Sequence, residues 1–158
     1  FSSDGAEYKT FNVHDGLGIA LAVRNGLDVV FMTGRISEMV SRRAAELGVT
    51  TVLQGISNKR DAIDALAIVK KLNLDAVAYI GDDLNDLPAM ERVGLVFAVH
   101  DACEHVCRQA TFVLNKCGGH GAVREAIELI LDAKIGMGTV VDNYVASAQQ
   151  TSTKPIGQ

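Results

Sequence analysis

Short apolar runs alternate with amphipathic stretches along most of the chain. Five runs rich in aliphatic and aromatic residues predict buried strands, over 27–34, 49–55, 76–81, 95–99 and 110–114. Between these runs, apolar residues recur at helical spacing over 15–26, 37–48, 57–73, 85–94, 103–109 and 118–134. Strands that are apolar on both faces and separated by helices are typical of a parallel sheet between two layers of helices. The pattern therefore predicts a three-layer α/β fold of the Rossmann-like kind.

The two ends of the chain depart from this alternation. Residues 2–13 predict a β-hairpin whose turn is Asp4-Gly5. From Gly136 onward the residues are small and polar with weak periodicity, which predicts a flexible tail over 136–158. The rest of the chain shows neither a repeat nor a linker, so residues 1–135 are expected to form a single domain.

Composition and charge narrow the class of protein. Of the 158 residues, 48% are hydrophobic and 22% are charged, which is enough apolar material for a core. The net charge of −4 and the lack of a Lys/Arg run argue against nucleic acid and membranes as partners. Three cysteines and no visible secretory signal predict a cytoplasmic protein. Because the sequence starts at Phe1 rather than Met, we expect further residues upstream in the complete protein.

Three carboxylates follow the predicted strand over 76–81, namely Asp82, Asp83 and Asp86. Two carboxylates about 4 Å apart repel by roughly 4 kcal/mol at an effective dielectric near 20, so such a group needs a proton, a base or a cation. Hard oxygen ligands at a strand end suit Mg²⁺. Alternatively, Asp83 or Asp86 caps the helix that follows. We expect Asp82 to bind the metal ion, and either Asp83 or Asp86 to cap the following helix or to position a neighbouring group.

Positive charge follows two other predicted strands. Thr33, Gly34 and Arg35 come directly after "VVFM" of the first predicted strand, and Lys59 comes shortly after the strand over 49–55. A cation at the start of a helix opposes the helix dipole, so two of them at one sheet edge suggest an anion between them. The alternative is that both are solvated surface cations. Phosphoryl transfer requires a carboxylate that binds a metal ion, a hydroxyl and fixed cations, and all of these follow predicted strands here. No residue here is evidently the nucleophile.

Three motifs together resemble the haloacid dehalogenase-like phosphatases. "FMTGR", "SNKRDA" and "YIGDDLND" match the later motifs of that family in the same order, each at a predicted strand end. Residues 4–134 are further similar to a small capless subfamily, the phosphatases of 3-deoxy-D-manno-octulosonate 8-phosphate, with "FNVHDGLGI", "QGISNK" and "GGHGAVRE" as additional matches. The subfamily often has Arg at the position of His14, and Arg or Lys at that of His120.

The resemblance implies a function and a set of roles. It implies Mg²⁺-dependent hydrolysis of the sugar-acid phosphate for lipopolysaccharide precursors, by a homotetramer in which the C-terminal tail can reach a neighbour's site. Metal binding falls to Asp82, and catalysis to Thr33, Lys59, Asp83 and Asp86. The substrate-binding positions, shared in part with a neighbouring subunit, are Asn12, Val13, His14, Asp15, Gly16, Ala20, Gly34, Arg35, Arg43 and Lys59.

One element of the family is absent from the sequence. The family carries its nucleophile and its acid/base on an Asp-x-Asp strand, placed just before the segment that begins here at Phe1. The resemblance implies about 20 upstream residues, the length of a strand and a loop. Without them the chain lacks a nucleophile, a metal ligand and the central strand. Two alternatives remain: a phosphatase of another nonulosonate 9-phosphate, and a non-catalytic oligomerisation domain of the same fold.

Overall fold

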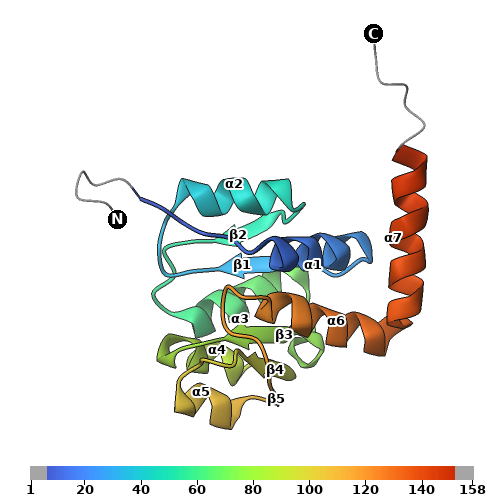
Figure 1. Cartoon of the computed structure of the whole chain (residues 1–158). Coiled ribbons are helices and arrows are strands. Elements are labelled where there is room, and N and C mark those ends of the chain that lie inside the picture. Colours follow the sequence, from blue (N-terminus) through green and yellow to red (C-terminus); the bar gives the residue numbers. More distant parts are fainter. Residues whose placement is uncertain (1–6, 152–158) are drawn as a thin grey trace.

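The computed structural model describes residues 7–151 and is an α/β structure (Figure 1). Its strands are β1 Val30–Met32, β2 Thr51–Leu53, β3 Ala78–Gly81, β4 Leu95–Ala98 and β5 Phe112–Val113. Its α-helices are α1 Val13–Arg24, α2 Glu38–Glu46, α3 Lys59–Lys70, α4 Leu87–Met90, α5 Glu104–Gln109, α6 Ala122–Ile135 and α7 Met137–Thr151. Two 3₁₀ turns are η1 Leu74–Ala76 and η2 Leu84–Asp86. The five predicted strands and six predicted helices are confirmed.

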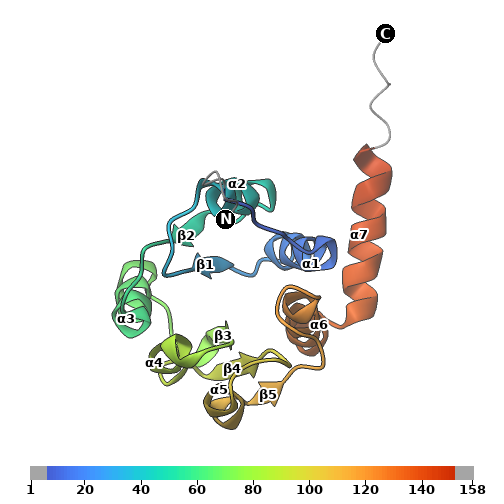
Figure 2. The same cartoon turned by 60° about the vertical axis from the view of Figure 1, so that its left-hand side comes forward.

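The strands run parallel but form two separate groups. β1 pairs with β2, with Val30 opposite Thr51. β3 pairs with β4, with Ala78 opposite Leu95, and β4 pairs with β5. Within residues 7–151, no strand joins β1 to β3, which face each other across an interval in Figure 2. The sheet predicted as continuous is therefore two parallel part-sheets.

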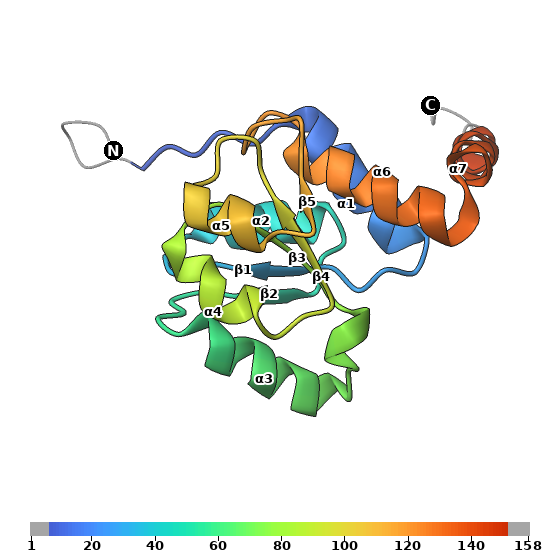
Figure 3. The ribbon, with the colours of Figure 1, turned by 90° about the horizontal axis from the view of Figure 1, so that it is seen from below.

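Helices cover both faces of the strands, as predicted for three layers. The alternation along β4 shows the two faces: Phe97 packs into a cluster with Ala122 and Ala126 of α6, whereas Val96 packs with Met90 of α4. α1 and α6 lie side by side on one face, and α3 and α4 cover the other (Figure 3). No helix of the described chain is long and apolar enough to cross a membrane.

The contact between α1 and α6 depends on a buried carboxylate and a glycine. Asp15 of α1 accepts hydrogen bonds from the backbone N–H groups of Gly121 (3.1 Å) and Arg124 (2.9 Å), so it satisfies the N-terminus of α6. Gly18 lets the two helices approach, because a Cβ there would lie 3.1 Å from the Arg124 Cα. These contacts hold the first and last helices of the layer together.

The N-terminal hairpin predicted over 2–13 is not formed by the residues that the structure describes there. Residues 7–12 form no strand, and Val13 already begins α1. The Asn12 side chain caps this helix by accepting from the His14 backbone N–H at 2.8 Å. Glu7 accepts a hydrogen bond from Ser37 at the start of α2 (3.1 Å), which ties the segment to the helical layer. The predicted turn at Asp4-Gly5 lies outside the described residues.

The segment after Gly136 contains a helix that the sequence reading did not predict. Apolar residues recur there at helical spacing: Met137, Val140, Val141, Tyr144 and Val145. Intervening Gly, Thr, Asn and Ser obscure this stripe, and Val140 is the position buried in the core formed with α1 and α6. The flexibility predicted for the rest of 136–158 stays a prediction.

Two neighbouring valines test whether α7 is docked. Val140 is 1% exposed and Val141 is 52% exposed. Val140→Ala removes two buried methyl groups, so we expect a loss of about 2 kcal/mol in the free energy of unfolding, measured by urea denaturation. Val141→Ala is the matched control and should cost less than about 0.5 kcal/mol. Equal effects of the two substitutions would mean that α7 is not held against the core.

Candidate active site

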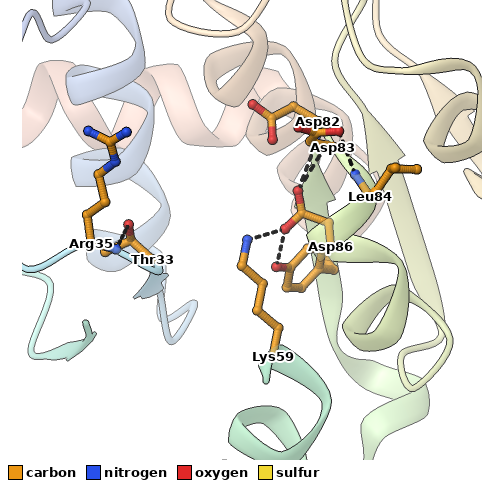
Figure 4. A network of polar contacts seen from close by, with 8 residues as sticks. Thr33, Arg35, Lys59, Asp82, Asp83, Leu84 and Asp86 are labelled. Atoms are coloured by element: carbon orange, nitrogen blue, oxygen red, sulfur yellow. Dashed lines mark hydrogen bonds and ion pairs between the residues drawn. The ribbon is translucent and has the colours of Figure 1, made fainter. Parts of the chain in front are cut away.

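The predicted site residues gather at the carboxyl ends of the strands. Thr33 directly follows β1, Lys59 opens α3 after β2, and Asp82 directly follows β3. Thr33 extends the β1–β2 ladder through its backbone, and its hydroxyl oxygen accepts from the Arg35 N–H at 3.3 Å. Figure 4 places Thr33 and Arg35 on one side and the Lys59–Asp86 group on the other. The sheet edge predicted from the sequence is therefore assembled from both part-sheets.

Asp86 is the centre of the hydrogen-bond network. Its Oδ1 accepts from Lys59 Nζ at 2.5 Å and from the Tyr79 hydroxyl at 2.7 Å. Its Oδ2 accepts from the backbone N–H groups of Asp82 (3.0 Å) and Asp83 (3.2 Å). Asp86 is only 3% exposed, so all of its acceptor capacity is used inside the protein. Asp86 thus fixes both the lysine and the loop that carries Asp82.

The carboxylates of this loop differ in their pKa. Burial acts to raise the pKa of Asp86, but the Lys59 ammonium, the two backbone N–H groups and the Tyr79 hydroxyl outweigh it and hold that pKa below the usual range. Partial burial and then the neighbouring Asp86 raise the pKa of Asp82, and Lys59 opposes this only in part. The ionised form of Asp82 is thus disfavoured in the folded chain.

Asp83 has the capping role that the sequence left open. Its side chain accepts from the Leu84 N–H at 2.7 Å, and Asp83 and Asp86 form a reciprocal capping box over η2. Asp86 takes part in the capping box as well, so of the three carboxylates Asp82 is the one whose side chain is not used in that box (Figure 4). A catalytic role for Asp83 or Asp86 stays a prediction.

The donor chemistry at Asp82 fits Mg²⁺. A half-exposed carboxylate beside a second acid is relieved by a cation, and Mg²⁺ takes one or two protein carboxylates and fills its shell with water or phosphate. Residues 7–151 hold no group of three His, Cys, Asp or Glu side chains placed to bind a metal. The role of Asp82 as a metal ligand therefore stays a prediction.

A cavity of about 610 Å³ lies between the two part-sheets. β1 and β3 line its opposite walls, α1 and α6 close one side, and α3 contributes Ile63 and Leu66 to the other. The lining is mainly apolar, with Asp15 and Arg43 among its few charged residues. An apolar space between two parallel strands whose facing edges are unpaired in the described chain has the shape and chemistry of a seat for one further strand.

The predicted substrate residues on and just before α1 differ in exposure and in their contact with the cavity. Asn12 and Gly16 line the cavity, whereas the side chains of Val13 and His14 are exposed. Arg43 crosses from α2 over Gly16, where a Cβ would come within 2.2 Å of its Nη2. The carboxylate of Asp15 accepts from the backbone N–H groups at the start of α6. Ala20 lies further along α1 and does not line the cavity in the described chain, and its role in substrate binding stays a prediction.

Sequence reasoning missed two side chains of the network. Tyr79 lies in the predicted strand over 76–81 and packs on the core, and its hydroxyl also donates to Asp86; the signal was a phenol in a buried strand three residues before Asp82. Gln54 follows β2 and accepts from the Ser37 N–H at 2.6 Å while donating to the Ser41 hydroxyl at 2.7 Å. Gln54 thereby fixes the start of α2, directly after the loop of Thr33 and Arg35.

Comparison with known proteins defines the class of protein that carries this site. The profile of the haloacid dehalogenase-like hydrolases matches residues 52–127. The chain is 44% identical over 132 residues to 3-deoxy-D-manno-octulosonate 8-phosphate phosphatase KdsC of Escherichia coli strain K12, covering 84% of this chain and 70% of that protein. The Yersinia pestis KdsC is 43% identical over 132 residues, with 84% of this chain and 71% of that protein covered.

Solved structures agree with these relatives. The Moraxella catarrhalis 3-deoxy-D-manno-octulosonate 8-phosphate phosphatase, in complex with magnesium, phosphate and KDO, superposes with a TM-score of 0.88 at 39% identity, covering 91% of this chain and 83% of that chain. The cobalt-bound Haemophilus influenzae phosphatase superposes with a TM-score of 0.80 at 38% identity, covering 84% of this chain and 78% of that chain. The fold and site are thus those of a haloacid dehalogenase-like hydrolase. Within that class, the chain belongs to the family of 3-deoxy-D-manno-octulosonate 8-phosphate phosphatases, which confirms the resemblance seen in the sequence.

Substituting Asp82 is expected to stabilise the folded chain. Since the pKa of Asp82 is raised on folding, its ionised form opposes folding at every pH above the unfolded value near 3.9. Asp82→Asn should therefore raise the free energy of unfolding at pH 7 by about 0.5 kcal/mol, a small gain because solvent screens the side chain. Asp82→Asn should also abolish any stabilisation by added Mg²⁺ in thermal scans. Asp142→Asn on α7 is the control and should change neither quantity.

Proposed function

We propose that the protein is a Mg²⁺-dependent phosphatase that hydrolyses 3-deoxy-D-manno-octulosonate 8-phosphate to the free sugar acid and phosphate, in lipopolysaccharide precursor synthesis. One observation carries the proposal. The buried Lys59–Asp86 pair and the Thr33 hydroxyl lie at the carboxyl ends of strands on opposite sides of the inter-strand cavity. A phosphoryl group above that cavity would meet a fixed cation on one side and a hydroxyl donor on the other.

Each of these side chains contributes a fixed charge or donor. Lys59 is held by Asp86 with its other N–H groups free to neutralise the phosphoryl oxygens and the attacking carboxylate. Thr33 donates its hydroxyl to a further phosphoryl oxygen, and Gly34 leaves the backbone there unobstructed. Asp82 would hold Mg²⁺, and the ion would stabilise the negative charge that develops on the phosphoryl oxygens. Because these groups are already in place, little reorganisation is needed when the phosphate binds.

The attacking group comes from the strand that would fill the cavity. Of the described residues, two carboxylates line the cavity: Asp15 accepts from the α6 backbone and Asp28 pairs with Lys70. The facing edges of β1 and β3 are unpaired in the described chain, which suits an extended segment parallel to both. We propose that a segment outside these residues enters there and brings an Asp-x-Asp pair to the edge. Its first Asp attacks phosphorus, its second protonates the leaving sugar oxygen, and water then hydrolyses the aspartyl-phosphate.

The sugar acid would be bound by two guanidinium groups. Arg35 is exposed beside Thr33, and Arg43 reaches over Gly16 at the mouth of the cavity. Guanidinium forks suit the carboxylate of a sugar acid. Asn12, Val13 and His14 lie at the start of α1, where they can also serve a neighbouring subunit. Exposed apolar side chains in this region, Tyr8 at 74%, Val13 at 73% and Ile36 at 80%, support contacts within a homotetramer.

The remaining parts of the proposal concern location and organisation. We place the enzyme in the cytoplasm, in keeping with a family of phosphatases that act on a sugar phosphate. Residues 1–135, together with the inserted strand, would form the catalytic domain. The C-terminal segment from Gly136 onward would reach a neighbouring subunit.

Phosphate release by the protein carrying its native upstream segment tests this function. With Mg²⁺, we expect kcat/KM for 3-deoxy-D-manno-octulosonate 8-phosphate to exceed that for a nonulosonate 9-phosphate and for glucose 6-phosphate by at least about 100-fold, since the carboxylate and chain length both contribute. Preference for the nine-carbon substrate would favour the other nonulosonate phosphatase. A folded tetramer that releases no phosphate from any of these would support a non-catalytic assembly domain.

A further inference from the structure

The Tyr79 hydroxyl occupies a position that apolar packing does not explain. Its ring packs into the cluster of β4, α4 and α5 that contains Met90 and Val96. A phenylalanine would fill that space without burying a hydroxyl, which costs free energy unless it is hydrogen-bonded. The hydroxyl donates to Asp86 Oδ1 at 2.7 Å, to the same oxygen that accepts from Lys59 Nζ. Burial and the Asp86 charge raise the pKa of Tyr79, so the phenol stays a donor.

The shared oxygen couples a rigid side chain to a flexible one. Tyr79 has two side-chain torsions and is held by its cluster, whereas the Lys59 ammonium ends a four-carbon stem. With Oδ1 held by the phenol and Oδ2 held by two backbone N–H groups, the Asp86 carboxylate cannot rotate. Lys59 is therefore attached to an anchored acceptor. Without the hydroxyl, Oδ1 would follow the lysine instead of fixing it.

We propose that Tyr79 is a positioning residue, whose hydroxyl locks Asp86 and thereby aims the Lys59 ammonium at the carboxyl edge of the cavity. The role assigned to Lys59 rests on the proposed phosphatase function. The positioning itself is a property of this chain without substrate. It can therefore be measured separately from activity.

Chemical labelling of Lys59 tests the proposal on the chain as it stands. Tyr79→Phe keeps the ring, and acetic anhydride labelling is followed by mass spectrometry with exposed Lys134 as the internal reference. We expect Lys59 to be labelled about 3- to 10-fold faster in the variant, because one hydrogen bond to a charged group has been lost. The Lys59 ¹⁵Nζ resonance should also shift or broaden in NMR spectra, as should the amide resonances of Asp82 and Asp83.

Two controls separate positioning from a loss of packing. Val96→Ala loosens the same cluster without touching the hydroxyl, so it should lower stability and leave Lys59 labelling unchanged. Tyr8→Phe removes an exposed hydroxyl and should leave Lys59 labelling at the wild-type rate. If Lys59 is labelled in Tyr79→Phe at the wild-type rate, or no faster than in Val96→Ala, Tyr79 only fills space and the proposal is wrong. Faster Lys59 labelling in Tyr79→Phe, combined with no phosphatase activity in the protein that carries its native upstream segment, would refute the proposed function and leave the positioning intact.

Discussion

Lys59→Ala is expected to lower both stability and activity by large factors. Its side chain is 10% exposed and that of Asp86 is 4% exposed, so the substitution leaves a buried carboxylate without its cation. Breaking a buried pair in this way costs about 3 kcal/mol in the free energy of unfolding. In the active enzyme, loss of the fixed charge beside the phosphoryl group should reduce kcat about 10³-fold. Urea denaturation and phosphate release measure the two effects.

The pH dependence gives the sign of the Lys59 effect. In the wild type the pKa of Asp86 is depressed on folding, so its contribution is present above the unfolded value near 3.9 and is lost as the pH falls below it. In Lys59→Ala, burial dominates and raises that pKa, so the variant should gain stability as the pH falls from 7 toward 4. A variant that loses stability with acid as the wild type does would contradict the central role of the pair.

Two further variants show whether the pair serves stability or chemistry. Lys70→Ala at the other end of α3 breaks the more exposed ion pair with Asp28 and should cost less than about 1 kcal/mol. Lys59→Met combined with Asp86→Leu removes both buried charges and should recover most of the lost stability. The double variant should remain inactive, since neither a cation nor the anchored loop remains.

Filling the inter-strand cavity is expected to have the second large effect. An apolar segment of about five residues, joined before residue 7 by a flexible loop, would pair with both β1 and β3 and bury its side chains against α6 and α3. Five buried apolar side chains at about 2 kcal/mol each, offset by about 1 kcal/mol per ordered residue, give about 5 kcal/mol. The melting temperature should rise by about 10–20 °C, read by circular dichroism.

A proline in the middle of the added segment is the matched control. It removes a donor and cannot pair on both sides, so that variant should keep the melting temperature of residues 1–158 alone. Amide exchange should slow at Met32 in β1 and Ile80 in β3 only with the unbroken segment. The neighbouring positions Thr33 and Gly81 already pair with β2 and with the residue that follows β4, so the alternate N–H groups face the cavity. Equal melting temperatures with and without the proline would mean that the segment does not enter between the strands.

Most of the fold follows from local patterns along the sequence. The β-branched run ending at Met32 and the run ending at Gly81 predicted β1 and β3, because burial on both faces demands continuous apolar residues. Ser57 and Asn58 are both residue types that favour a helix N-cap, and Asn58 has this role in α3, where its side chain accepts from the Arg60 N–H at 3.1 Å. α7 escaped because its buried contact, Val140, depends on packing against α1 and α6 rather than on a strong local pattern.

The location of the site was predictable from the sequence, but the separate role of each carboxylate was not. The strand-end rule brought Thr33, Lys59 and Asp82 together, because parallel strands share one carboxyl edge. The same rule cannot tell which acid faces a cation and which faces backbone N–H groups, and Asp83 and Asp86 turned out to cap η2. Asp15 likewise satisfies α6 from a distance of more than 100 residues, a contact that no local spacing encodes.

The most direct test of the account is a crystal structure of the protein with its upstream segment, Mg²⁺ and phosphate. We predict a strand between β1 and β3, the metal on the Asp82 carboxylate, and the phosphate between the Thr33 hydroxyl and the Lys59 ammonium. A segment that packs at an outer edge, beside β2 or β5, would contradict the account, as would ions bound away from the carboxyl ends of the strands.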